Sequence, residues 1–199
     1  MCVRQKILIT AACLFLSVIS SCQNQPSPPA LPREPRAGDL VINEFLAAPA
    51  LTDANHDGII DVSQDEFIEL VSTVGDTLDL TGVTIHVGTA LRHSFPATTL
   101  APHQPAVVFG GGSPGLSLPA QVVVQTASSG TLALADTGAT IEVRNRTGLI
   151  VDSVTYGAAT SDVSSNRDPE LTGSFVDFTS IAGAVVHYSP GTKANGSYF

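Results

Sequence analysis

The sequence Asp53-Ala-Asn-His-Asp-Gly-Ile-Ile-Asp61 is followed, three residues later, by Asp65-Glu-Phe-Ile-Glu-Leu70. The first part places carboxylate or carboxamide side chains at positions 1, 3, 5 and 9 of a loop, with Gly58 at position 6. In calcium loops this spacing lets oxygen atoms converge on one hard cation while the glycine makes the sharp turn. The second part is typical of a β-strand. We therefore expect an acidic loop, residues 53–65, at the edge of a β domain.

The charge around this loop favours a bound cation. Six carboxylates occur within 17 residues, and no lysine or arginine stands between Arg36 and Arg92. A divalent cation removes the repulsion among such side chains. Position 12 is Gln64 instead of the usual glutamate, so the last ligand must come from one of the two acids that follow it. The alternative is a solvated acidic loop without metal. The predicted calcium ligands are Asp53, Asn55, Asp57, the Ile59 carbonyl, Asp61, Asp65 and Glu66.

The rest of the chain reads as short strands separated by turns. β-branched residues dominate these runs, glycines interrupt them, and no window after the amino terminus has a 3.6-residue period. Asn145 to Gly148 is the expected turn of a hairpin over 140–154. The fold class predicted is all-β, an antiparallel sandwich or barrel, and the missing crossover helices exclude a parallel α/β fold. The expected strands are 40–46, 66–71, 80–87, 104–109, 121–125, 130–134, 139–144 and 149–156.

The amino terminus is predicted to be an export signal. Arg4 and Lys6 precede an apolar run of about 13 residues, which is too short to span a bilayer. The run ends in Ile19-Ser20-Ser21-Cys22, which resembles the lipobox of bacterial lipoproteins. That resemblance implies cleavage before Cys22, an acyl lipid such as palmitate on that cysteine, and, from Gln23, a place at the outer membrane. We expect a signal peptide at 1–21, a Pro-rich tether at 22–38 and a β domain at 39–199.

Composition and motifs exclude several classes of site. All three cysteines lie at or before residue 22, so the domain has no disulfide. Without the signal, 7 basic and 18 acidic residues remain, and an acidic protein is repelled by nucleic acid. The five histidines lack the spacing of a zinc site, and no G-x-S-x-G motif is present. The glycine-rich stretch 110–115 lacks a following lysine and reads as a flexible loop.

Several segments together resemble the lamin tail domain, an immunoglobulin-like β-sandwich family with members among exported bacterial proteins. The resemblance covers about residues 39–195. Members commonly have tryptophan where this chain has Val83, which alters the packing of the core. The fold implied is an antiparallel immunoglobulin-like sandwich, and the fold alone does not define an activity. The matching segments are 41–44, 66–70, 78–82, 132–138, 148–157 and 189–195.

Other acidic and basic residues are interpreted as structural. Glu44 and Glu69 lie on expected strands and are predicted to be hydrogen-bonding framework residues. Arg167, in Arg167-Asp-Pro-Glu-Leu171, is expected to order a long final loop through backbone or carboxylate contacts.

These features predict a lipid-anchored module of the cell envelope that binds or displays and has no catalysis of its own. Calcium would stabilise its acidic loop, the membrane would be reached through Cys22, and the partner would be a protein or a polysaccharide. The alternative is a metal-dependent envelope hydrolase or nuclease accessory domain. A third hypothesis is self-association through exposed strand edges.

Overall fold

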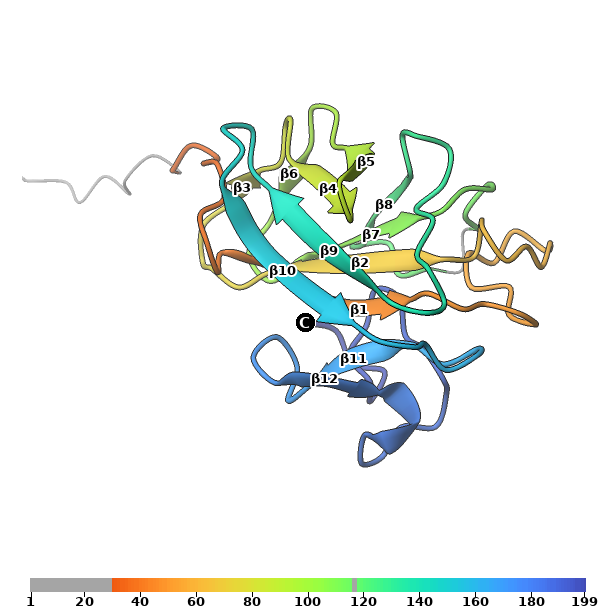
Figure 1. Ribbon diagram of the computed structural model, residues 1–199. Coiled ribbons are helices and arrows are strands. Elements are labelled where there is room, and N and C mark those ends of the chain that lie inside the picture. Colours follow the sequence, from red (N-terminus) through yellow and green to blue (C-terminus); the bar gives the residue numbers. More distant parts are fainter. Residues whose placement is uncertain (1–29, 116–117) are drawn as a thin grey trace, which may run out of the picture.

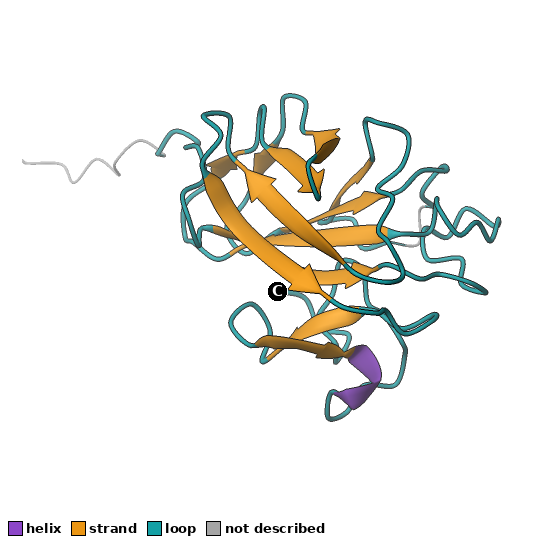
Figure 2. Ribbon diagram, in the orientation of Figure 1, coloured by secondary structure: helices purple, strands orange, loops and turns teal. Residues whose placement is uncertain are grey.

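The chain forms a sandwich of two β-sheets (Figure 1). The computed structural model describes residues 30–115 and 118–199, so the predicted signal peptide and Cys22 lie outside the described residues. The only helix in this part is the single 3-10 turn η1, Phe178–Ser180 (Figure 2). No helix there is long and apolar enough to cross a lipid bilayer. The strands are β1 Leu40–Leu46, β2 Phe67–Ser72, β3 Leu78–Asp79, β4 Thr84–Val87, β5 Ala90–Ser94, β6 Thr99–Leu100, β7 Pro105–Phe109, β8 Val123–Thr126, β9 Ala139–Arg144, β10 Ile150–Tyr156, β11 Ser165–Asp168 and β12 Ser174–Asp177.

Antiparallel pairing dominates, and this confirms the predicted all-β, immunoglobulin-like sandwich. The larger sheet has the order β12-β11-β1-β2-β7-β8, the smaller has β10-β9-β4-β5, and β3 and β6 form a separate pair. The exception is the pair β7 and β8, which run parallel. The predicted hairpin is also confirmed, because β9 and β10 pair around a turn in which the Gly148 amide donates to the Asn145 carbonyl (2.9 Å).

Alternate side chains of the two sheets meet in the main core. In β4 and β9 every second residue is buried, as expected for strands with one face in solvent. Phe45 of β1 lies in this core, with its ring centroid 4.8 Å from that of Tyr156 and 5.3 Å from that of Phe175. Val83 is fully buried there as well, so a smaller residue fills the position where lamin tail domains commonly carry tryptophan.

The central strands of the larger sheet are buried on both faces. All residues of β1, β2 and β7 are buried, so the outer face of this sheet must also be covered. A second apolar cluster includes Leu46, Phe67 and Phe109 of these strands, and Tyr188 of the C-terminal segment packs against it. The chain after β12 therefore covers the outer face of the larger sheet together with Leu118 and Val122, which precede β8.

Some expected strands differ from the observed ones. Residues 130–134 form an irregular segment, although Leu132 and Leu134 are buried. Two of its amides bond to side chains: Ala133 N donates to Thr131 Oγ1 (3.1 Å) and Leu134 N donates to Glu66 Oε1 (3.0 Å). Of the strand expected over 80–87, only β4 (Thr84–Val87) forms, because the residues before it form a turn. β3, β5, β6, β11 and β12 were not expected from the sequence pattern.

The packed domain begins earlier than residue 39. Arg33 forms a bridge with Leu78, and the Asp79 amide donates to the Arg33 carbonyl (2.7 Å). Asn145 Nδ2 donates to the carbonyl of Pro35, which is buried (3.2 Å). The C-terminal part of the predicted tether 22–38 is thus held against the sandwich from Arg33 onward.

Candidate functional site

The acidic loop closes on itself through the side chain of its first aspartate. Asp53 accepts hydrogen bonds from the amides of Asp57 (3.1 Å) and Gly58 (3.0 Å). Gly58 has φ +87°, the left-handed conformation that favours glycine. The residues at positions 1, 5 and 6 therefore form the sharp turn that the calcium-loop spacing predicts.

The middle of the loop is attached to the glycine-rich stretch 110–115. Asp57 Oδ2 accepts the amide of Ser113 (3.0 Å), and Asn55 Nδ2 donates to the carbonyl of Gly111 (3.3 Å). A Cβ atom on Gly112 would lie 2.4 Å from Asp57 Oδ2, and Gly112 has φ +74°. The glycines thus allow the two loops to approach closely. The expectation of a free flexible loop at 110–115 misses this contact.

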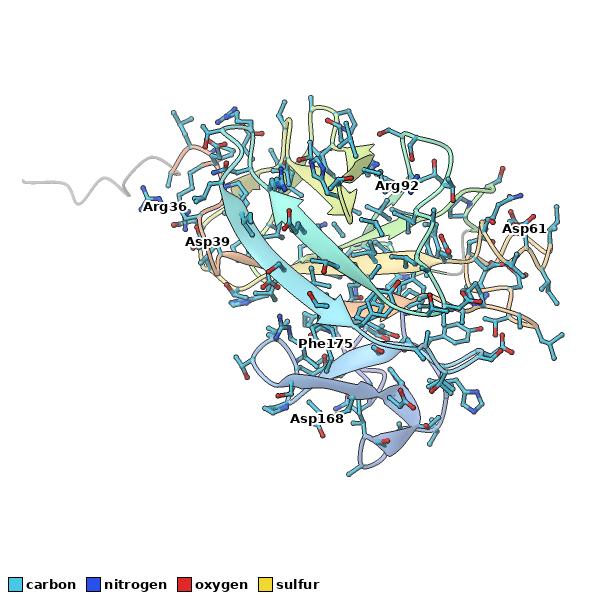
Figure 3. The ribbon with its side chains drawn as sticks, in the orientation of Figure 1. Arg36, Asp39, Asp61, Arg92, Asp168 and Phe175 are labelled. Carbon is cyan, nitrogen blue, oxygen red and sulfur yellow. The ribbon has the colours of Figure 1, made fainter. Side chains whose placement is uncertain are left out.

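The end of the loop is organised by two further aspartates. Asp65 is buried, and its two oxygens accept the amides of Asn55 (3.1 Å) and Asp61 (2.8 Å). Burial raises the pKa of Asp65. Asp61 lies at the outer part of the loop (Figure 3), where amide donors from Ser63 and Gln64 lower its pKa.

The predicted calcium ligands are only partly brought together. Asp53 binds the Asp57 amide, Asp65 binds the Asn55 amide, and Asn55 Nδ2 donates to Asp57 Oδ2 (3.4 Å). Ile59, by contrast, is 61% exposed at the rim. Within residues 30–115 and 118–199, no three His, Cys, Asp or Glu side chains gather closely enough to hold a metal ion. A calcium ion here would therefore need amide and carbonyl oxygens or water among its six to eight ligands.

Glu66 is directed elsewhere. Its Oε1 accepts the Leu134 amide, and burial raises its pKa to about 7. Because neighbouring residues of an extended chain point to opposite sides, Glu66 reaches the 131–136 segment while Asp65 reaches the loop. The structure gives no support to Glu66 as a ligand shared with Asp53 and Asp57.

A second polar group lies under the C-terminal segment. Glu44 of β1 and Glu69 of β2 are directly opposite each other, and both are fully buried. Glu44 accepts hydrogen bonds from Ser164 Oγ (2.6 Å), from the Ser189 amide (2.8 Å) and from Ser189 Oγ (3.0 Å). Glu69 accepts the Gly191 amide (2.7 Å). The prediction that both glutamates are hydrogen-bonding framework residues agrees with these contacts.

A third carboxylate, missed by sequence reasoning, completes the attachment. Glu170 accepts the Ala194 amide (2.8 Å) and Asn43 Nδ2 (2.8 Å), and the same Asn43 nitrogen also donates to Glu69 (3.0 Å). Three glutamates therefore hold three backbone amides of residues 189–194 against the sheet. The sequence places Glu170 in the segment 167–171 and Ala194 in the segment 189–195, but its spacing does not indicate that the two segments meet.

The burial of these carboxylates has an electrostatic cost. Burial raises the pKa of Glu44 to about 7, and hydrogen bonds from Ser164 and Ser189 offset part of the rise. Burial, followed by the nearby charge of Glu44, raises the pKa of Glu69 well above its ordinary value of 4.5. Because the C-terminal segment covers both groups completely, a substrate has no access to this carboxylate pair in the folded protein.

Arg167 of β11 joins the sheet to the final part of the chain. Its guanidinium group donates to the carbonyls of Ile42 (2.7 Å) and Gly173 (2.9 Å) and pairs with Asp152 (3.1 Å). It also lies 4.6 Å from the ring centroid of Phe175. The expected contacts of Arg167 with backbone and carboxylate groups are confirmed.

The buried pair predicts a stability that falls as pH rises. A carboxyl group whose pKa is higher in the folded protein than in the unfolded chain binds protons on folding. For Glu44 this stabilisation is complete below its ordinary pKa of 4.5 and is lost as pH rises through about 7. Glu69 acts in the same direction. Urea unfolding should show a larger free energy of unfolding at pH 5 than at pH 8.

Glu44→Gln is the matched test of this effect. Glutamine keeps one oxygen acceptor and cannot ionise, so the pH dependence should become weaker between pH 5 and 8. An unchanged slope in the variant, or a flat profile in the unmodified protein, would show that the buried pair does not control the stability.

Comparison with known proteins agrees with this architecture. The model of the lamin tail domain family matches residues 33–158, which includes the chain from the Arg33 bridge to the end of β10. No match was found among curated proteins. The match covers more than half of the chain, and its start coincides with the first residue that packs on the sandwich. This chain is a member of the lamin tail domain family.

Proposed function

We propose that this protein is a lipid-anchored display and binding module of the cell envelope, with no catalysis of its own, whose acidic loop is stabilised by calcium. The observation that carries the proposal is the way the acidic loop is built. Its carboxylates accept amides of the loop itself and of the glycine-rich stretch, as Asp53 and Asp57 do. Side chains used in this way hold a surface loop in one conformation, which suits recognition of a partner.

A cavity beside this loop supports a binding role. It has a volume of about 540 Å³ and lies between His56 of the acidic loop and the C-terminal segment, including Val185, His187 and Tyr188. Val185 is 91% exposed. Apolar walls with a few polar groups are typical of ligand sites, and the volume is within their usual range. We place the protein or polysaccharide partner at this cavity.

The chemistry of the loop is compatible with calcium. Asp53, Asn55, Asp57 and Asp65 supply the hard oxygen ligands that this ion prefers, and the ion would offset their mutual repulsion. Calcium would supply rigidity at this position. The anchor at Cys22 and the remaining part of the tether would keep the module at the outer membrane surface.

Calcium should raise the melting temperature of the protein. Binding to the folded state alone stabilises it by mass action, so a saturating concentration, about 100 times the dissociation constant, adds roughly 2.7 kcal/mol. Asp57→Asn should reduce the rise, and Asp168→Asn, an exposed control outside the loop, should not (Figure 3). Differential scanning calorimetry with and without calcium measures both. An unchanged melting temperature in calcium would contradict the proposal that the acidic loop binds calcium. Calcium-dependent hydrolysis of envelope polymers would contradict the proposed non-catalytic role.

Cys22→Ser should release the protein from membranes. Serine cannot carry the thioether-linked lipid, so the variant should move from the membrane fraction to the soluble fraction of an expressing bacterium. The measurement is fractionation followed by immunoblotting. Retention of Cys22→Ser in the outer membrane would contradict the lipid anchor.

A further inference from the structure

The cavity between the acidic loop and the C-terminal segment has mainly aliphatic walls. We call it the His56–Tyr188 cavity, after one lining residue from each of these two segments. Its volume is about 540 Å³, and Tyr188 is the only tyrosine, phenylalanine or tryptophan among the described residues that line it. The aliphatic part of the lining consists of Leu118, Pro119, Val185, Val186 and Pro190.

The walls of this cavity are held by hydrogen bonds. The carbonyl of His187 accepts the Ser164 amide (3.0 Å), and the residues that follow it are attached to the buried glutamates. On the side of the acidic loop, the carbonyl of Asn55 accepts the Gly115 amide (2.7 Å), directly before His56. The cavity is therefore formed before a ligand binds, which lowers the entropic cost of binding.

Negative charge acts on one wall of the cavity. Burial raises the pKa of the Tyr188 hydroxyl, and three nearby carboxylates raise it further. They belong to Asp53, Asp65 and Asp162. Because Asp162 lies outside the acidic loop, a calcium ion in the loop would not directly neutralise this third carboxylate.

No basic side chain of the lining offsets this charge. The described lining residues come from the segments 37–91, 93–143 and 168–192, none of which contains a lysine or an arginine. Lys193 is next along the chain, but its ammonium nitrogen lies over the ring of Phe199, 5.8 Å from the centroid. Phe199 lines a different, smaller cavity. The His56–Tyr188 cavity therefore favours a cation and repels an anion.

The aliphatic walls and the negative charge together select the class of ligand. A lysine or arginine side chain joins an apolar stem to a cationic end, so it suits both features. Aliphatic side chains of the same peptide would cover Val185 and Val186, which are exposed. A polysaccharide presents hydroxyl groups, whose burial against aliphatic walls costs free energy unless each finds a hydrogen-bond partner. An anionic polymer would in addition be repelled.

We propose that the His56–Tyr188 cavity binds a cationic, apolar peptide segment, in which lysine or arginine residues are separated by aliphatic ones. The juxtaposition of an open aliphatic cavity with nearby carboxylates, and with no basic side chain among its described lining residues, carries this inference. It rests on the proposed binding role of the cavity, and it selects a protein partner over a polysaccharide. It does not depend on the lipid anchor.

The experiment is isothermal titration calorimetry of the full-length protein with matched short peptides at pH 8, where free histidine is uncharged. The peptides alternate valine with lysine, with glutamine or with glutamate, and a tetrasaccharide of N-acetylglucosamine is the fourth probe. The lysine peptide should bind about tenfold more tightly than the glutamine peptide, and the glutamate peptide should not bind. Raising the salt from about 10 mM to about 150 mM shortens the Debye length from about 30 Å to about 8 Å, so it should weaken the lysine peptide several-fold.

The outcomes separate the inference from the binding role on which it rests. Equal binding of the lysine and glutamine peptides, or binding of the tetrasaccharide alone, overturns the cationic peptide and leaves the cavity as a binding site. No binding of any of the four probes overturns both the inference and the placement of the partner at this cavity. A failure of calcium to raise the melting temperature bears on neither.

Asp162→Asn tests the role of the charge. It removes one nearby carboxylate and should weaken the lysine peptide several-fold, whereas Asp168→Asn, an exposed control away from the lining, should not. Asparagine keeps an Oδ1 acceptor for the amides of Ala50 and Leu51, so the variant should retain the fold. Unchanged affinity in Asp162→Asn overturns the proposal.

Val185→Ser tests the role of the aliphatic wall. Val185 is exposed, so serine there should leave the core intact and weaken the lysine peptide several-fold. Leu149→Ser is the matched control, because Leu149 is also exposed but does not line the cavity. An equal loss of affinity in both variants, or no loss in Val185→Ser, would place the peptide elsewhere and overturn the assignment.

Discussion

The attachment of the C-terminal segment to Glu44 and Glu69 is the constraint on which the rest of the structure depends. β1, β2 and β7 are buried on both faces, so the larger sheet requires a cover on its outer side. The family model ends at residue 158, and part of the cover, including Tyr188, comes from residues beyond it. The two buried glutamates hold this cover by its backbone amides, at Ser189 and Gly191. The isolated match region would lack the amides of Ser189 and Gly191, which these two carboxylates accept.

The loops that carry the proposed functions gather at one end of this covered sandwich. The acidic loop connects β1 to β2, and the glycine-rich stretch follows β7, so both leave central strands of the larger sheet. The cover itself lines the larger cavity, through Val185 to Pro190. A sheet buried on both faces therefore positions these loops, in the way that functional residues commonly lie on loops held by a rigid scaffold.

The sequence was a good guide to the features that are local. Periodicity and turn residues predicted β1, β2, β7, β9 and β10, and the order of weak motifs predicted the family. Strands β11 and β12 were missed because their sequences, Ser165-Asn-Arg-Asp168 and Ser174-Phe-Val-Asp177, are polar and short and are stabilised by pairing with β1 and with each other. The opposite error occurs at residues 130–134, where a strand was expected and none forms. Leu132 and Leu134 are buried in the core there, but no neighbouring strand pairs with the segment. The direction of the Glu66 side chain and the role of Glu170 depend on contacts between distant segments, and residue spacing along the chain does not predict such contacts.

Hydrogen–deuterium exchange at pH 5, followed by NMR, tests the central claim most directly. The account predicts that the amides of Ser189, Gly191 and Ala194, which are bound to Glu44, Glu69 and Glu170, exchange as slowly as the amides of β1 and β2. It would be contradicted if these three amides exchanged as fast as those of exposed loops while β1 and β2 stayed protected, because the cover would then not be part of the stable fold.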